Sequence, residues 1–431
     1  MDRPSLKFKL YDNTVIAFFF FFLAYSYALT IQIAFPLKIS EIALGLIFLL
    51  ILIHQKIRIL GLRHPYQIAL LAFILFTVLS TTVNLFWEYP YSFHEYESRF
   101  GYKFDSIMKL AYLILAYLAY IVSANALHDR PYKYLSLFLY GAAIAALYSW
   151  YLFISSLIGV PYLLLPGMDE EPQTMYVFGK TLVRCGTFKE GNYMGLFLLV
   201  SGIVAMYVKK NKFAILFFIT IITTSSTTSI VGLGIFLSLH YFHAYFNTKN
   251  FHRFLVVAAV AGIVLVLLFQ IEGFRFIIVD KLFSDTSKIT HATFSKADRT
   301  NSTLTALNVG NANPFIGVGI SNYALHYIEY LADPRFRFMN FKVIPNNIYM
   351  EILSEVGYTG LFLFLIFLYC LFRKSTIDKS RVLRNGLIAM LICFIAFPTF
   401  TLLFIWFYFG LIASLDSSKP SRSTASLETS E

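Results

Sequence analysis

Residues 66–87, YQIALLAFILFTVLSTTVNLFW, form a continuous apolar run without a single charged side chain. A helix rises 1.5 Å per residue, so a run of this length is about long enough to cross the ~30 Å hydrocarbon core of a bilayer. Similar runs recur along the chain, separated by short polar stretches. The sequence therefore predicts an all-α integral membrane protein. It excludes an outer-membrane barrel, whose strands alternate in polarity over about ten residues.

The composition excludes a soluble protein. Of the 431 residues, 58% are hydrophobic and only 14% are charged, whereas soluble domains carry about 25% charged residues. The net charge of +11 does not indicate a nucleic-acid partner, because the basic residues fall in short loops, where they orient a membrane protein. The three cysteines, Cys185, Cys370 and Cys393, have no spacing typical of disulfides or metal sites, and we expect no metal or other cofactor.

The apolar runs predict twelve transmembrane helices. They cover residues 14–35, 39–54, 66–87, 106–126, 134–158, 191–208, 212–224, 228–246, 254–271, 347–372, 386–398 and 399–415. Two pairs are divided only by the polar turn at 223–229 and by Pro398, so ten spans are the alternative. The first run is too long for the apolar segment of a signal peptide, and we expect it to be retained as a span.

The charged residues of the loops predict the orientation of the chain. Lysine and arginine dominate the short loops on one side of the predicted bundle, which is therefore the cytoplasmic side. Three longer loops, 88–105, 159–190 and 272–346, fall on the outer side and carry acids and bases in near balance. We expect both termini in the cytoplasm, a single polytopic domain over residues 1–415 and a disordered tail over 416–431.

We expect the chemistry at the outer face of the membrane. Transporters usually place ionisable residues near the bilayer midplane, and the predicted spans are almost empty of them. The few charges inside the spans, among them Lys109, Glu351 and Glu355, lie near helix ends. The loop over 272–346 is too long for a simple connection, which favours binding or catalysis there. A transporter with large outer loops is the alternative.

The end of the loop over 159–190 has features of an anion-binding site. Residues 184–192 read RCGTFKEGN. Arg184 offers a fixed positive charge and a donor fork suited to phosphate. Asn192 is placed to cap the following helix, whose positive dipole end would face outward. An ordinary capped helix beside a surface arginine explains the same pattern.

The loop over 272–346 adds further basic residues. Arg299 is predicted to open a helix that leads into NPFIGVG at residues 313–319. Near the end of the loop, three bases alternate with aromatic residues: Arg335, Arg337 and Lys342. This alternation suits phosphate binding with rings stacked on sugars, and it equally suits an anchor at the lipid headgroups.

Residues 343–361, VIPNNIYMEILSEVGYTGL, predict a helix start with two carboxylates on one face. Asn346 or Asn347 would cap this helix. Glu351 and Glu355 lie four residues apart, so they share a face within the first turns. Two such carboxylates can pair with loop arginines, act as a base or simply stabilise the helix N-terminus. A structural role for at least one of them is the more common case.

Together these segments resemble the O-antigen ligase and O-antigen polymerase superfamily of bacterial envelope glycosyltransferases. Residues 184–192 are similar to the superfamily's arginine–glycine–phenylalanine entry to a span, and residues 313–319 to its Asn-Pro-x-x-Gly-x-Gly segment. Residues 346–361 are similar to its Asn-x-Tyr to Gly-Leu signature. The resemblance covers roughly residues 180–400 and fits a glycosyltransferase C-like bundle with a large outer loop before the tenth span.

The resemblance implies transfer of a glycan from an undecaprenyl-diphosphate-linked donor at the outer face of the bacterial inner membrane, without metal or nucleotide. Arg184 and Arg299 match the arginines that hold the diphosphate, whose growing charge guanidinium groups stabilise. The other residues expected to bind substrate are Arg335, Arg337, Lys342, Asn192, Asn346, Asn347 and Tyr349. The resemblance also implies the bilayer, a chain-length regulator and a flippase as partners.

One departure from the superfamily bears on the reaction. Its ligase branch has a histidine, thought to be the base, where this chain has Asn346. The candidate bases are therefore Glu351, Glu355 and His326, with His291 as a further one. We expect a polymerase of a surface polysaccharide, either O-antigen or exopolysaccharide. Ligase-type transfer to a lipid or protein acceptor is the first alternative, and transport of lipid-linked glycan is the second.

Overall fold

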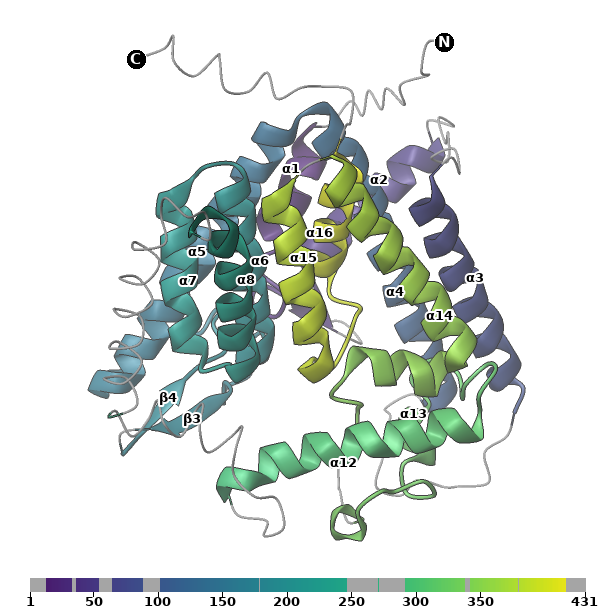
Figure 1. Cartoon of the computed structure of the whole chain (residues 1–431). Coiled ribbons are helices and arrows are strands. Elements are labelled where there is room, and N and C mark those ends of the chain that lie inside the picture. The colour runs from purple at the N-terminus through teal and green to yellow at the C-terminus, as the bar shows by residue number, and fades with distance from the viewer. Residues whose placement is uncertain are drawn as a thin grey trace, which may run out of the picture.

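The computed structural model describes residues 13–32, 36–53, 64–87, 101–177, 179–245, 270, 291–337, 342–378 and 380–415, which are predominantly helical (Figure 1). The principal helices are α1 (Asn13–Phe22), α2 (Ile39–Ile53), α3 (Pro65–Leu85), α4 (Tyr102–Asp129), α5 (Pro131–Ile158), α6 (Gly191–Tyr207), α7 (Asn211–Thr224), α8 (Thr227–Tyr245), α12 (His291–Ala312), α14 (Ile348–Ile377), α15 (Arg381–Cys393) and α16 (Leu403–Ala413). The shorter elements are β1 (Ile31–Gln32), β2 (Pro36–Leu37), β3 (Thr174–Val177), β4 (Lys180–Val183), α13 (Tyr323–His326), η3 (Pro334–Phe336) and η4 (Phe394–Ala396). The two strand pairs, β1–β2 and β3–β4, are antiparallel.

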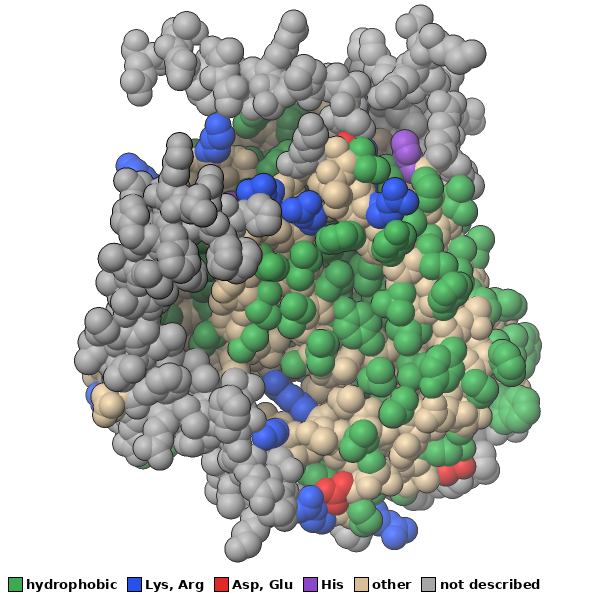
Figure 2. All heavy atoms as spheres, viewed as in Figure 1, with side chains coloured by type: hydrophobic (Ala, Val, Ile, Leu, Met, Phe, Trp, Pro, Cys, Tyr) green, Lys and Arg blue, Asp and Glu red, His purple; other side chains and the backbone are tan. Residues whose placement is uncertain are grey.

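Four helices, α3, α4, α5 and α14, are long and apolar enough to cross a membrane, and several shorter helices are also apolar. On the face shown in Figure 2, hydrophobic side chains form a broad band below a margin of basic side chains. This is the architecture expected of a multi-pass α-helical membrane protein. Apart from residue 270, the predicted span at 254–271 lies outside the described residues. The count of ten or twelve spans therefore stays a prediction.

The first predicted span is interrupted, because α1 ends well before its apolar run does. Beyond α1 the backbone turns to bond with the loop between α5 and α6. The N–H of Tyr27 donates to the Thr187 carbonyl at 3.0 Å, and the N–H of Leu29 donates to the Pro166 carbonyl at 2.7 Å. These donors would otherwise continue the helix. The expectation of one unbroken helix was therefore wrong here.

The core of the bundle forms around α16. A helix that is apolar on all sides is expected to be buried on all sides, and Trp406, Phe407 and Tyr408 are completely buried. Helix α16 packs closely on α4 at Gly410. A Cβ atom at this position would lie 2.7 Å from the Tyr120 carbonyl oxygen, so a glycine permits the close approach of the two helices.

One end of the bundle carries the remaining structure. Helix α12 lies across this end, which also carries the β3–β4 hairpin (Figure 1), and packs on α14. It begins at His291, well before the predicted start, so Arg299 lies inside the helix rather than at its opening. Helices α12 and α13 enclose a small separate apolar cluster that includes Val318 and Val343.

Candidate active site

Helix α14 is broken at Gly357, which has φ 78° and ψ 179° within an otherwise helical segment. The short helix before the break starts at Asn347, whose side-chain oxygen accepts hydrogen bonds from two N–H groups of the first turn, at 2.9 and 3.3 Å. Of the two asparagines predicted to cap this helix, Asn347 rather than Asn346 is the cap. Glu351 and Glu355 both lie on this short helix.

Residues 313–319 pack against the break in α14. The N–H of Gly319 donates to the Glu355 carbonyl at 2.8 Å. A Cβ atom on Gly317, which has φ +64°, would lie 2.6 Å from the same carbonyl oxygen, and a Cβ atom on Gly357 would lie 2.6 Å from a carbonyl of the loop. The glycines of this motif therefore allow two backbones to touch. Their contact fixes the position of the carboxylate-bearing turn.

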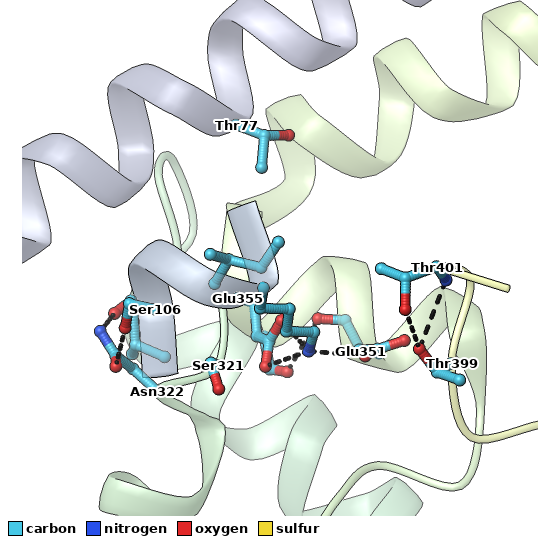
Figure 3. Close-up of polar contacts among 12 residues, drawn as sticks. Thr77, Ser106, Ser321, Asn322, Glu351, Glu355, Thr399 and Thr401 are labelled. Carbon is cyan, nitrogen blue, oxygen red and sulfur yellow. Dashed lines mark hydrogen bonds and ion pairs between the residues drawn. The ribbon is translucent and has the colours of Figure 1, made fainter. Parts of the chain in front are cut away.

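Lys109, Glu351 and Glu355 form a buried ionic cluster (Figure 3). The Lys109 Nζ lies 2.7 Å from Glu351 Oε1 and 3.0 and 2.7 Å from the two carboxylate oxygens of Glu355. The glutamate side chains are only 2% and 3% exposed. When both carboxylates are ionised, the single lysine between them leaves a negative charge uncompensated within the cluster. Since burying such a charge is costly, the arrangement marks a candidate functional site.

A second ion pair lies beside this cluster. The Lys342 Nζ donates to Asp105 Oδ2 at 3.2 Å and to Ser321 Oγ at 2.7 Å. It also lies close enough to Lys109 and Glu355 for their charges to interact. Burial lowers the pKa of Lys342, and the Asp105 carboxylate acts in the opposite direction. Lys342 is therefore held within the charged network of the site.

Arg184 lies at the start of α6, packed on Gly191, where any Cβ atom would collide with the guanidinium group. Its Nη2 donates to Asn192 Oδ1 at 3.3 Å. Its Nε is buried and has no hydrogen-bond partner among the described residues. The expected helix cap at Asn192 was wrong. Glu190 occupies the cap position without a side-chain cap bond, and Asn192 orients the arginine instead.

Arg299 approaches the same place from α12. Its charge interacts with those of Glu190 and Arg184. Its guanidinium group has no hydrogen bond or ion pair with the part of the chain that the structure describes. Tyr193, one turn into α6, lies near both Glu190 and Glu351. Two arginines from separate elements thus converge near Glu190, and Tyr193 lies between this place and Glu351.

The surroundings of the two arginines suit an anion. Burial and then the positive charge of Arg299 lower the pKa of Arg184 to about 10, while Glu190 acts in the opposite direction. Burial also lowers the pKa of Arg299. Both groups still carry a positive charge at neutral pH, and a bound anion would relieve their mutual repulsion. Figure 2 shows basic side chains in a hollow of the surface on the side of α12.

Other predicted residues are engaged elsewhere. Arg335 is exposed, and its Nη2 lies 2.6 Å from Asp333 Oδ2 in the same turn. Arg337 is also exposed. His326 lies at the end of α13, with its Nδ1 3.7 Å from Glu329 Oε2. Burial lowers the pKa of His326, and Glu329 acts in the opposite direction, so the imidazole is neutral at neutral pH.

Two further predicted residues connect helices. The Asn346 amide donates to Ser302 Oγ of α12 at 3.3 Å. The Tyr349 hydroxyl donates to the Leu391 carbonyl of α15 at 2.8 Å. Both contacts hold the short helix of α14 in place. His291 begins α12, and its side chain lies outside the described residues.

Sequence reasoning missed three members of the site. Lys109 was noted only as a charge near a helix end, although a lysine inside an apolar run is itself a signal of function. Glu190 and Gly191 belong to the motif at residues 184–192, but nothing local showed that the arginine would lie on the glycine. Only the fold brings Lys109 to the two carboxylates and Glu190 to the two arginines.

Comparison with known proteins places part of this site in a family. Residues 213–365 match the O-antigen ligase family model. The resemblance predicted from the motifs is thereby confirmed. The O-antigen ligase match runs from α7 into the second part of α14, so it includes Arg299, residues 313–319 and both glutamates, whereas Arg184 precedes it. No curated protein matches the chain.

Proposed function

We propose that the protein is a multi-pass glycosyltransferase of the bacterial inner membrane that lengthens a surface polysaccharide, either O-antigen or exopolysaccharide. Its donor is a glycan repeat unit linked to undecaprenyl diphosphate, used at the outer face of the membrane. The O-antigen ligase match over residues 213–365 supports glycan transfer. The convergence of Arg184 and Arg299 on one partly desolvated place carries the proposal.

A diphosphate leaving group suits these two guanidinium groups. Among the described residues, the buried Nε of Arg184 has no hydrogen-bond partner. The guanidinium group of Arg299 has no hydrogen bond or ion pair there either. Arginine binds phosphate oxygens through two parallel hydrogen bonds. In desolvated surroundings, such donors stabilise the charge that develops as the bond between the sugar and the diphosphate breaks. The arginines thus have the chemistry to hold the leaving group.

The choice of polymerase over ligase depends on Asn346. An amide cannot accept a proton, and this one is engaged with Ser302. The base that the ligase branch is thought to use is therefore missing at this position. The family description itself, O-antigen ligase, favours ligase-type transfer as the second candidate. As a polymerase, the protein would depend on a flippase for its donor and on a chain-length regulator.

Reconstitution tests the proposal directly. The purified protein is placed in liposomes with a lipid-diphosphate-linked repeat unit, and the products are separated on a size ladder. A ladder of lengthened glycans is expected. Transfer that appears only when an acceptor lipid is added would identify a ligase. Movement of the intact donor across the bilayer without any transfer would identify a transporter.

Removing the guanidinium group of Arg184 is expected to abolish lengthening. Loss of a donor that stabilises a developing charge costs about 10²–10³ in rate. The rate of glycan lengthening by R184A should therefore fall by at least this factor, while the variant protein still inserts into the membrane. K180A is the matched control, because Lys180 is exposed on the strand that leads to Arg184. Normal polymer from R184A would show that the diphosphate is held elsewhere.

A further inference from the structure

We infer that Glu351 is the base that accepts the proton of the attacking hydroxyl, and that Glu355 and Lys109 are positioning residues. The two carboxylates are therefore not interchangeable, although they lie four residues apart on the same helix. This inference rests on the proposed glycosyl transfer. It assigns the missing base to a residue on the short helix before the break in α14.

Glu355 is fully engaged by its surroundings. The Lys109 Nζ bonds both of its carboxylate oxygens, at 3.0 and 2.7 Å. Its carbonyl accepts from the Gly319 N–H at 2.8 Å and from the Ser80 hydroxyl at 3.3 Å. Side chain and backbone are thus both held, and each carboxylate oxygen already accepts a hydrogen bond from Lys109. These contacts suit a residue that fixes the lysine.

Glu351 keeps one oxygen available. Its Oε1 lies 2.7 Å from the Lys109 Nζ. Its Oε2 is buried and has no hydrogen-bond partner of normal geometry among the described residues, although the Phe400 N–H faces the carboxylate. The whole residue is only 1% exposed. A buried acceptor left unsatisfied costs stability, so its retention calls for an explanation. The hydroxyl group of a bound sugar would supply the missing donor.

Glu351 lies beside Tyr193 and beside a polar loop. Tyr193 lies near Glu351 on one side and near Glu190, the neighbour of both arginines, on the other. Thr399 and Thr401 lie beside Glu351 in Figure 3, on the side away from Glu355. Their hydroxyls are 3.0 Å apart and can also bond a sugar. These hydroxyls and the carboxylate oxygen can together bond an acceptor sugar.

In the transfer step, the acceptor hydroxyl donates its hydrogen bond to Glu351 Oε2. Its oxygen attacks the anomeric carbon, the bond between that carbon and the diphosphate oxygen breaks, and the proton passes to Glu351. The electron pair of the broken bond leaves with the lipid diphosphate, whose charge the arginines stabilise. Lys109 then faces one neutral and one ionised carboxylate, so the cluster loses its excess negative charge.

The test compares E351Q with E355Q in liposomes that contain the lipid-diphosphate-linked repeat unit. Transfer rates are measured between about pH 5.5 and 8.5, and donor binding is followed through the melting temperature. General-base catalysis contributes about 10²–10⁴ in rate, so E351Q should lower kcat at least 100-fold with the donor-induced shift retained. The wild-type transfer rate should fall as the pH is lowered, because the base becomes protonated. The residual rate of E351Q should not show this fall. E355Q should be slower but keep that fall.

The controls separate the base from its surroundings. E41Q removes another buried carboxylate that pairs with a lysine, Lys38, at the start of α2, and should keep the wild-type rate. If E351Q fails to insert into the membrane, E351D is tested instead. If Glu351 is the base, E351D should bind the donor normally but show a changed pH profile of transfer rate. If the transfer rate of E351Q is within tenfold of wild type, Glu351 is not the base. The same holds if E355Q, rather than E351Q, loses the fall in rate at low pH. Either result leaves the proposed glycosyl transfer intact. Wild type that transfers no glycan overturns the proposed function as well.

Discussion

Arg184 shows how a single side chain acquires the properties of a site. Its guanidinium group lies on a glycine, donates one hydrogen bond to Asn192 Oδ1, and keeps a buried Nε without a partner among the described residues. The neighbouring Arg299 adds a like charge. Both effects disfavour the charged form, so the pKa of Arg184 falls while staying above neutrality. An arginine tolerates this environment better than a lysine does.

This difference predicts a pH-dependent phenotype for R184K. Free lysine has a pKa of about 10.4, well below that of arginine, and the same surroundings would lower it toward neutrality. The variant should therefore lose glycan transfer as the pH rises above neutral, because the neutral amine no longer attracts diphosphate. Wild type, with the pKa of Arg184 at about 10, should stay active there. Parallel pH profiles of transfer rate would contradict the environment described.

The element that organises the site is the broken helix α14. Asn347 starts its short first part, and residues 313–319 pack against the break through backbone hydrogen bonds. The carboxylates therefore sit on a turn that is clamped from two sides rather than on a free helix. The long second part of α14 crosses the bundle (Figure 1) and anchors this turn.

Replacing Gly317 by alanine should disturb this clamp. The added Cβ would lie 2.6 Å from the Glu355 carbonyl oxygen, at a residue with φ +64°. Strain of this kind costs about 1–3 kcal/mol, so G317A should lower the melting temperature and slow glycan transfer together. G234A is the matched control, because nothing lies within 4 Å of the new methyl group and alanine favours the helix. Equal stability of G317A and wild type would show that the contact is dispensable.

At the scale of the whole molecule, the charged groups of the site collect at one end of the bundle. The β3–β4 hairpin, α12, the short part of α14 and the starts of α4 and α6 all lie there (Figure 1). The distribution of basic loops predicts that this end faces outward. A lipid-linked donor would reach it from the outer leaflet.

Cysteine labelling tests this orientation. Tyr176, 70% exposed on β3, and Lys212, exposed at the start of α7, belong to opposite sides of the predicted topology. In a cysteine-free background, a membrane-impermeant maleimide should label Y176C in intact spheroplasts and K212C only after permeabilisation. The reverse pattern would place the candidate site in the cytoplasm and exclude an outer-leaflet donor.

Features that depend on a short stretch of chain were predicted from the sequence. The long apolar spans follow from the transfer of apolar side chains out of water, which needs no partner elsewhere in the chain. The cap at Asn347 and the shared face of Glu351 and Glu355 follow from helix geometry. The resemblance to the O-antigen ligase family also follows from short motifs, and the match over residues 213–365 confirms it.

The tertiary structure alone decided which of these residues meet. Lys109 bonds Glu355, which lies 246 positions further along the chain. Arg299 approaches Arg184 from another helix. The turn after α1 ends a helix that its apolar residues would continue, because Tyr27 bonds a distant loop. Ion pairs and hydrogen bonds between such remote positions depend on how the helices pack, and no local pattern records that packing.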